Sequence, residues 1–377
     1  MKDMGIYVHI PFCKSKCYYC DFNSFADKEY QIDRYVQCLK KEIKIKSNLN
    51  YVVRSIYIGG GTPSILPAEK IEKILQAIAN SFTMDDNAEI TIEINPGTVT
   101  KRRLESYFRM GINRLSIGLQ SSNDEILKKI GRIHNYEQFE NIIKMAKEVG
   151  FENINADAMI GLPEQTIYDV EDTITKLIKM KLTHISVYSL IVEPETKMEK
   201  MLKSGKLKMQ DEEIERYMYW FTKRLLEEHG YLHYEISNFA IPGYISKHNM
   251  DCWNQKEYLG FGVSAASYED RVRYSNIYSL EKYMTNIEKN EAYRNKKIEE
   301  IQNEKMQMNE FVLLNLRKIR GMSLKSFNKK FNKRFFDEYK KQVIHLWEEE
   351  LIQVEENNVR LSNKGLDLAN LVWREFI

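Results

Sequence analysis

Residues 7–22 read YVHIPFCKSKCYYCDF, and this stretch indicates both how the fold begins and what chemistry it carries. The apolar run Ile6–Ile10 predicts a β-strand, and three cysteines follow it closely: Cys13, Cys17 and Cys20. Three thiolates on one short loop can hold three corners of a [4Fe–4S] cubane and leave the fourth iron without a protein ligand. An open metal position of this kind is where an exogenous ligand binds and chemistry begins.

The alternative for these cysteines is a structural zinc site in which Cys38 is the fourth ligand. Cys38 lies in a predicted helix beside its apolar stripe, where a single cysteine is more often a small core side chain. The chain has five cysteines, an odd number, so a disulfide framework is not expected. The spacing therefore favours the cluster and leaves zinc as the alternative.

Beyond the cysteines, short β-like runs alternate with amphipathic helical stretches. Six successive units predict an α/β fold with a parallel sheet, either open or curled into a partial (β/α)6 barrel, whose functional groups follow the carboxyl ends of the strands. The expected strands are Ile6–Ile10, Ser55–Ile58, Glu89–Ile94, Arg114–Gly118, Asn153–Ile160 and His184–Tyr188. The expected helices are Tyr30–Lys46, Pro67–Asn80, Thr100–Met110, Tyr136–Val149, Ile167–Met180 and Asp211–His229.

Three parts follow from the pattern along the chain. Residues 1–240 hold the barrel, and residues 241–300 predict an irregular connecting region that becomes rich in lysine and glutamate. Residues 301–377 predict helices followed by a hairpin at Ile352–Leu361, which suggests a small helical, winged-helix-like domain.

The composition excludes some classes of partner. The chain has 56 basic and 54 acidic residues, a net charge of +2, and residues 301–377 carry 14 basic against 11 acidic, so nucleic-acid binding is not expected. No apolar run approaches the ~20 residues of a membrane span, although peripheral membrane contact stays open. The amino terminus has no room for a secretory signal core before the cysteines, so a cytoplasmic protein is expected.

The quoted stretch resembles the cluster loop of radical-SAM enzymes, particularly the branch around oxygen-independent coproporphyrinogen III oxidase. Its specific signal is the CxxxCxxC spacing with an aromatic residue before the third cysteine. The resemblance covers roughly residues 5–270, where the motifs occur in the same order, and implies a radical-SAM partial barrel that binds S-adenosylmethionine (SAM). It also implies an electron donor, because one electron from the reduced cluster cleaves SAM to methionine and a 5′-deoxyadenosyl radical.

Glycines and polar residues follow the second to fifth expected strands, where the resemblance places the SAM pocket. Consecutive glycines at residues 59–61 let backbone N–H groups approach a ligand, and Arg132 suits a carboxylate such as the methionyl end of SAM. Asp157 could accept hydrogen bonds from ribose hydroxyls or an amine. Taken singly, each has an ordinary structural explanation. The residues expected at SAM are Tyr7, Tyr19, Gly60, Gly61, Thr62, Glu93, Gln120, Arg132 and Asp157.

Two departures separate this chain from the oxidase. The oxidase has a fourth cysteine two positions after the third, where this chain has Phe22, and it carries a longer extension than the twelve residues that precede Cys13 here. Both departures match the oxidase-like heme chaperones of the HemW type. The resemblance implies a protein that binds heme and transfers it to an acceptor hemoprotein. The alternative is the oxidase, which removes two propionate carboxylates, and productive SAM cleavage stays open.

Residues 248–253 read HNMDCW and resemble an HNxxYW motif linked to heme binding in that branch. Cys252 stands where tyrosine is expected. His248 could supply an imidazole ligand to heme iron, and Cys252 a thiolate. The ordinary explanations are a structural histidine in a turn and a buried cysteine.

Overall fold

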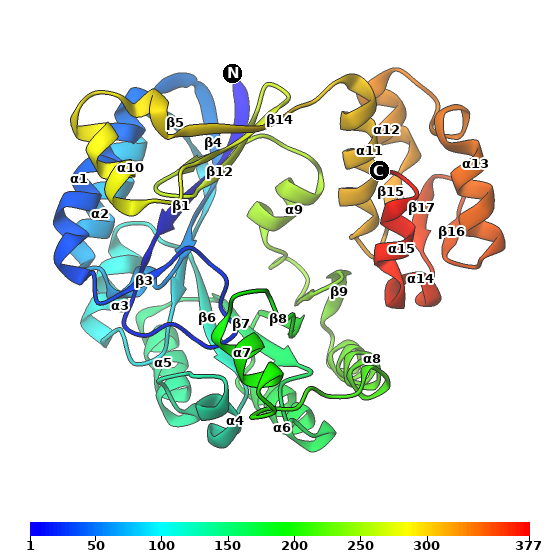
Figure 1. Cartoon of the computed structure of the whole chain (residues 1–377), viewed down its shortest axis with the longest axis horizontal. Coiled ribbons are helices and arrows are strands. Elements are labelled where there is room, and N and C mark those ends of the chain that lie inside the picture. The colour runs from blue at the N-terminus through cyan, green and yellow to red at the C-terminus, as the bar shows by residue number, and fades with distance from the viewer.

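The computed structural model describes residues 1–377, and its centre is a sheet of twelve strands (Figure 1). Six of these strands run parallel and side by side, so the six strand–helix units predicted from the sequence are confirmed. The first three are longer at their amino-terminal ends than the apolar runs indicated. In sheet order the six strands are β1 (Lys2–Ile10), β4 (Asn48–Gly60), β5 (Phe82–Ile94), β6 (Arg114–Gln120), β7 (Asn153–Ile160) and β8 (His184–Ser189).

Helices connect these strands and cover the outer face of the sheet (Figure 1). Their apolar stripes pack against outward-facing strand residues in a core of 55 buried side chains, because an amphipathic helix must bury its apolar face. In the helix of residues 32–45, for example, Tyr35, Leu39 and Ile43 are buried at helical spacing. The helices are α1 (Ile32–Ile45), α2 (Ala68–Ala79), α3 (Lys101–Arg109), α4 (Asp124–Lys129), α5 (Tyr136–Val149), α6 (Ile167–Lys179), α7 (Lys197–Lys203) and α8 (Glu212–Glu228).

The inner face of the same sheet is polar, because side chains alternate between the two faces of a strand. In β6, Leu115, Ile117 and Leu119 belong to the outer core. The alternate residues Arg114, Ser116, Gly118 and Gln120 therefore point to the inside, and all of them are buried. The strands thus enclose a polar interior.

The sheet is curled. Tyr57 of β4 and Tyr188 of β8 line one pocket, although four strand spacings, about 19 Å in a flat sheet, separate their strands. The sheet does not close on itself, since β14 and β9 form its two ends. This is the partial barrel that the resemblance implies, one of the two arrangements that the alternation of strands and helices left open.

Residues 241–300 differ from the expected irregular region, because most of them extend the sheet. A strand there pairs in parallel with β1, and three antiparallel strands continue outward. These strands are short and the outermost one is charged and exposed, so no apolar run indicated them. The elements are α9 (Lys247–Trp253), β11 (Tyr258–Phe261), β12 (Ala266–Glu269), β13 (Val272–Asn276), α10 (Leu280–Glu288) and β14 (Lys296–Ile301). At the opposite end of the sheet, β9 (Leu232–Glu235) and β10 (Asn238–Ala240) follow β8.

The carboxyl-terminal part has its own core of 18 buried residues, separate from that of the barrel. The predicted hairpin forms there as two strands of a three-stranded sheet. The division of the chain at residues 240 and 300 stays a prediction. The elements are α11 (Glu304–Leu316), β15 (Met322–Ser323), α12 (Leu324–Phe331), α13 (Phe335–Glu348), β16 (Ile352–Val354), β17 (Asn358–Leu361), α14 (Asn363–Asp367) and α15 (Ala369–Arg374).

Backbone and side-chain contacts join this part to the barrel, with α9 lying between them (Figure 1). The N–H of Ile236 donates to the carbonyl of Arg317 at 3.1 Å. The Arg317 guanidinium also lies 4.4 Å from the ring centre of Trp253 and 5.4 Å from that of Trp373. Stacking on both rings ties the end of α9 to the carboxyl-terminal helices. No helix combines the length and apolarity that crossing a bilayer needs.

Candidate functional site

The cysteine loop leaves the sheet at the carboxyl end of β1. The two-residue strands β2 (Phe12–Cys13) and β3 (Phe25–Ala26) pair in parallel and close the loop that carries Cys17 and Cys20. The N–H groups of Gly61 and Thr62 donate to carbonyls of Ile10 and Phe12, both at 2.8 Å. These bonds hold the cysteine loop against the glycine turn that follows β4.

A pocket of about 410 Å³ opens beside this loop, at the carboxyl ends of the strands. Cys13, Cys17 and Cys20 line it together with eight of the nine residues expected at SAM. Those eight are Tyr19, Gly60, Gly61, Thr62, Glu93, Gln120, Arg132 and Asp157. The ninth, Tyr7, does not line the pocket. The Tyr7 hydroxyl bonds Nδ1 of His9 at 2.9 Å, and its ring stacks on Tyr57. Tyr7 therefore packs against Tyr57, which does line the pocket.

Two of the three thiols have polar partners inside the pocket. The Thr62 hydroxyl donates to Sγ of Cys13 at 3.6 Å, and Nη1 of Arg132 donates to Sγ of Cys17 at 3.5 Å. Burial raises the pKa of the Cys20 thiol to about 11, so a positive charge is needed to keep this sulfur as a thiolate. A bound metal centre supplies that charge.

The arrangement fits a cubane better than a zinc ion. No group of three or more His, Cys, Asp or Glu side chains converges on a single-ion position. Cys38, the fourth ligand that zinc would need, is buried in α1, and its thiol points to the carbonyl of Met284 at 3.7 Å. A cubane instead takes thiolates at separate corners, as a three-cysteine loop provides.

The glycine turn is shaped by how closely it approaches the cysteine loop. Gly60 has φ +113°, in the left-handed region, and a Cβ there would lie 2.6 Å from the His9 ring. A Cβ on Gly61 would lie 2.7 Å from the carbonyl oxygen of Phe12 and 2.9 Å from Sγ of Cys13. Only glycine fits at either position.

Gly61→Ala is therefore expected to displace Cys13 and to reduce bound iron severely, with a stability loss of roughly 2 kcal/mol. Iron per chain after anaerobic reconstitution and the thermal midpoint measure the two effects. Gly111→Ala is the matched control, because Gly111 has φ +88° but a Cβ there would meet no atom within 4 Å. The control should lose about 1 kcal/mol through backbone strain and keep its iron. Equal iron in both variants would contradict the prediction.

Two half-buried carboxyl groups face the pocket. Glu93 accepts hydrogen bonds from the Tyr57 hydroxyl at 2.9 Å and from the N–H of Gly60 at 3.1 Å. Burial raises its pKa to about 7, and the nearby charge of Asp157 adds to the rise. Burial also raises the pKa of Asp157, although Nδ2 of Asn155 donates to it at 2.8 Å. Neither carboxyl has an ion-pair partner within the protein, so both can accept bonds from a ligand's amine or hydroxyls.

Arg132 brings a half-buried cation to the same wall. Its Nη2 donates to the carbonyl of Gly118 at 2.8 Å and to Oδ1 of Asn95 at 3.1 Å, while Nε has no partner. Next to it, Gln120 has φ +72°, a strained backbone conformation for a residue other than glycine, and its buried Oε1 is unpaired. Unpaired buried donors and acceptors on a pocket wall suit a polar ligand.

The sequence prediction missed several lining residues, among them Tyr57, Asn95, Ser116 and Tyr188. Asn95 lies two positions from Glu93, and Ser116 lies on the same inner face of β6 as Gln120. Polar residues at alternate positions of otherwise apolar strands were the available signal. Arg114, which is also buried and has an unpaired Nε, lies on the same inner face of β6.

The HNMDCW segment forms α9, outside the pocket lining. The Glu89 carboxylate accepts from the N–H groups of Lys247 at 3.0 Å and His248 at 3.1 Å and so fixes the start of the helix. Nδ1 of His248 bonds the Ser55 hydroxyl at 2.9 Å, and its ring stacks on Tyr57 with 5.3 Å between ring centres. Tyr57 in turn bonds Glu93, so one aromatic side chain separates His248 from the pocket.

His248 and Cys252 differ in their chemical state. Burial lowers the pKa of His248 to about 4, so its imidazole is neutral at physiological pH. Its Nε2 makes no hydrogen bond and is not among the fully buried unpaired atoms. Burial raises the pKa of Cys252 to about 11, which keeps it a thiol. Of the two, His248 offers iron the better ligand atom.

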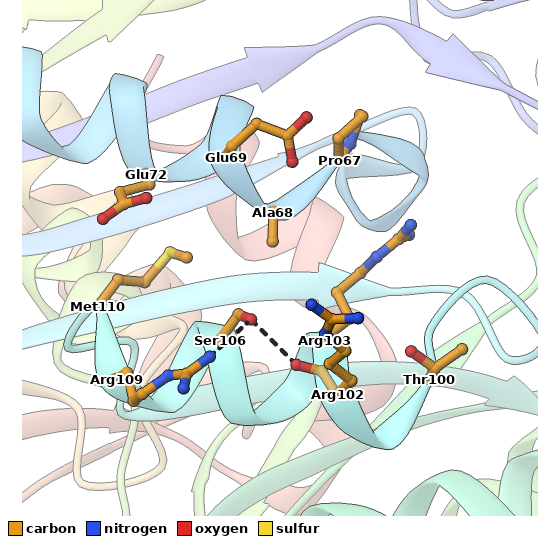
Figure 2. Close-up of a pocket in the computed structure, with 10 residues that line it drawn as sticks. All are labelled: Pro67, Ala68, Glu69, Glu72, Thr100, Arg102, Arg103, Ser106, Arg109 and Met110. Atoms are coloured by element: carbon orange, nitrogen blue, oxygen red, sulfur yellow. Dashed lines mark hydrogen bonds between the residues drawn. The ribbon is translucent and has the colours of Figure 1, made fainter.

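A larger hollow, about 670 Å³, lies outside this site, between α2 and α3 (Figure 2). Arginines of α3 and the acidic Glu69 and Glu72 of α2 line it, without any cysteine or aromatic residue. Arg103 donates to the backbone carbonyls of Ser64 at 2.7 Å and Thr98 at 2.9 Å. Arg103, at this groove, therefore links the segment that follows β4 to the segment that follows β5.

Comparison with known proteins agrees with the fold. Residues 7–177 match the radical SAM superfamily, and residues 302–368 match the HemN C-terminal domain. In three dimensions the chain resembles coproporphyrinogen III oxidase (HemN) from Escherichia coli, with a TM-score of 0.86 and 22% identity over 100% of this chain and 90% of that one. Fold and site together define a radical-SAM protein, a class that uses a [4Fe–4S] cluster and SAM.

Two relatives match over nearly their whole length. The chain is 36% identical to the heme chaperone HemW of Lactococcus lactis, over 100% of this chain and 98% of the relative. It is also 36% identical to heme chaperone HemW of Bacillus subtilis, over 98% of each chain. The chain belongs to the HemW family of radical-SAM proteins.

Proposed function

We propose that Cys13, Cys17 and Cys20 hold the cluster and that SAM occupies the adjoining pocket. Arg132 would bind the carboxylate of the methionyl group, and Glu93 would accept hydrogen bonds from its amine. Asp157 would accept from ribose hydroxyls. When bound together, the cluster and SAM supply one-electron chemistry, for which an electron donor is required. The protein's part is to orient both groups and to exclude water.

We further propose that the protein is a heme chaperone, which binds heme and transfers it to an acceptor hemoprotein. The observation that carries this proposal is the full-length similarity to two heme chaperones. Phe22 supports it, since this side chain lines the pocket mouth at 61% exposure where the oxidase resembled here has a fourth cysteine.

His248 is the proposed protein ligand to heme iron. Its Nε2 carries the free lone pair if Nδ1–H donates to Ser55, and such a hydrogen bond fixes the ring and strengthens it as a ligand. Trp253 lies at the end of the same helix, with its ring under the Arg317 guanidinium. Cys252, a half-buried thiol, is the weaker candidate.

The decisive experiment reconstitutes the protein anaerobically with iron and sulfide and then adds heme or, separately, SAM with coproporphyrinogen III. Absorbance reports heme binding, and chromatography reports protoporphyrinogen. Heme bound at about one per chain without porphyrinogen turnover is the expected result. Turnover without tight heme binding would instead make the protein an oxidase that lacks the fourth cysteine.

His248→Ala should weaken heme binding about tenfold or more and shift the Soret band, because an axial ligand is lost. Cys252→Ala should leave the affinity and the spectrum nearly unchanged. Heme titrations followed by absorbance measure both. The opposite ranking of the two variants would assign the iron to Cys252.

A further inference from the structure

The end of α9 lies beside α11, which packs on α12 (Figure 1). A hollow lined by three lysines lies there, away from the cluster pocket. We call it the three-lysine pocket. Its volume is about 410 Å³, and no acidic residue lines it. The lining residues are Asn254, Phe311, Asn315, Lys318, Ser326, Lys329 and Lys330.

Two of the ammonium groups are held by neutral oxygens. Nζ of Lys318 donates to Oδ1 of Asn254 at 2.8 Å and to Oδ1 of Asn315 at 2.6 Å. Nζ of Lys330 donates to Oε1 of Gln255 at 2.8 Å and to its backbone carbonyl at 3.4 Å. Each ammonium has three N–H donors and therefore keeps one for a further acceptor.

These positive charges are not neutralised within the protein. Burial alone lowers the pKa of Lys318 to about 8, since no carboxylate faces it. Burial likewise lowers the pKa of Lys330 to about 8, and the nearby acids Glu310 and Glu257 only partly oppose this. Glu310 is paired with Arg273, and Glu257 with Lys2.

Although much of Lys330 is exposed, its ammonium lies 5.0 Å from the ring centre of Phe311 and against Gln255. The pocket thus combines an excess of positive charge with spare N–H donors and the Ser326 hydroxyl. An oxyanion satisfies all of these groups at once, because its oxygens accept several charge-assisted hydrogen bonds.

We propose that the three-lysine pocket binds an oxyanion, the phosphate or carboxylate group of a small ligand, through Lys318, Lys329 and Lys330. Asn254 and Gln255 follow α9, whereas the lysines belong to the carboxyl-terminal part. A bound oxyanion would strengthen the contact between the carboxyl-terminal part and the two residues that follow the HNMDCW segment.

Competition for lysine labelling tests this in the full-length protein. An amine-acetylating reagent is applied near pH 8, and mass spectrometry follows each lysine with millimolar phosphate or with sodium chloride at equal ionic strength. Phosphate should slow labelling of Lys318 and Lys330 about fivefold and leave the exposed Lys325 and Lys340 unchanged. Equal labelling in both salts would exclude a phosphate ligand, and the carboxylate comparison below then decides the proposal.

Variants separate binding at this pocket from general salt effects. Lys318→Gln should abolish the phosphate protection of Lys330, whereas Lys325→Gln, on the same helix as Lys330, should retain it. Thermal midpoints of both variants confirm folding. Protection that survives Lys318→Gln would overturn the proposal.

Two sources of the oxyanion are distinguished in the same assay. A porphyrin with free propionates is compared with its dimethyl ester, which has no carboxylate. Protection by the free acid alone identifies a carboxylate ligand, and protection by phosphate alone identifies a phosphate ligand. Protection by neither overturns the proposal without bearing on the heme-chaperone function, which is tested at His248.

Discussion

Cys17→Ser should reduce bound iron from about four atoms per chain to almost none, the largest effect expected of any single substitution. Cys17 lies on the only loop that carries three cysteines, and its sulfur is the one beside the Arg132 guanidinium at 3.5 Å. Serine is nearly isosteric but is a poor ligand for iron of a cluster, since its hydroxyl stays protonated. Iron and sulfide analysis and the visible absorbance of the reconstituted protein measure the loss.

Cys38→Ser is the matched control. Its thiol is buried in α1 against the carbonyl of Met284, and no other potential metal ligand converges there. This variant should keep its full iron content at a modest cost in stability. Equal loss of metal in both variants, with zinc in the purified protein, would instead support the four-cysteine zinc site.

Glu93→Gln should stabilise the protein without ligands above neutral pH by up to about 3 kcal/mol. The pKa of Glu93 rises from 4.5 to about 7 on folding because the carboxyl is buried beside Asp157. Each unit of pKa shift corresponds to about 1.4 kcal/mol, so ionising this group in the folded state costs up to about 3 kcal/mol. Glutamine removes that cost because it carries no charge.

The sign of the pH dependence follows from proton binding. Between pH 4.5 and about 7 the folded state holds the Glu93 proton and the unfolded state does not, so stability falls as pH rises through this window. The difference between wild type and Glu93→Gln should be small below pH 4.5 and largest above about pH 7. Urea unfolding across this range measures it, with the exposed Glu105→Gln as control. A difference that does not change with pH would contradict the prediction.

The same substitution should have the opposite effect on SAM. If Glu93 accepts from the methionyl amine, wild type should bind SAM roughly tenfold more tightly at pH 8 than at pH 6, because the carboxylate must be ionised. Glu93→Gln should bind more weakly and with little pH dependence in this range. Equilibrium binding to the reconstituted protein measures both affinities. A stabilised variant with weakened SAM binding is the pattern expected where a buried charge is kept for a ligand.

The local parts of the fold were predictable. The strands and helices of the first two-thirds, the cysteine loop and the glycine turn after β4 follow from alternation, helical spacing and residue type over a few positions. Strand ends in a parallel sheet meet at one edge, so Glu93, Gln120 and Asp157 could be grouped around the cysteines without knowledge of their contacts.

Three features could not be predicted from such local patterns. The sheet extension from β11 to β14 was missed, because short strands owe their stability to pairing with neighbours. Tyr7 was expected at SAM but lies behind Tyr57, since the curl of the barrel decides how deep each layer of side chains sits. His248 was expected from a resembled motif, yet its contact with Ser55 joins residues 193 positions apart.

Residue order was enough to predict the class of cluster loop, the succession of strand–helix units and a set of residues that line one pocket. These depend on covalent spacing and on the periodicity of one element. Three properties exist only in the folded chain. Arg132 donates to Cys17, and burial raises the pKa of Glu93. Three lysines line one pocket that has no acidic residue. Such properties arise from strand order, curl and burial, which bring together groups that no local pattern relates.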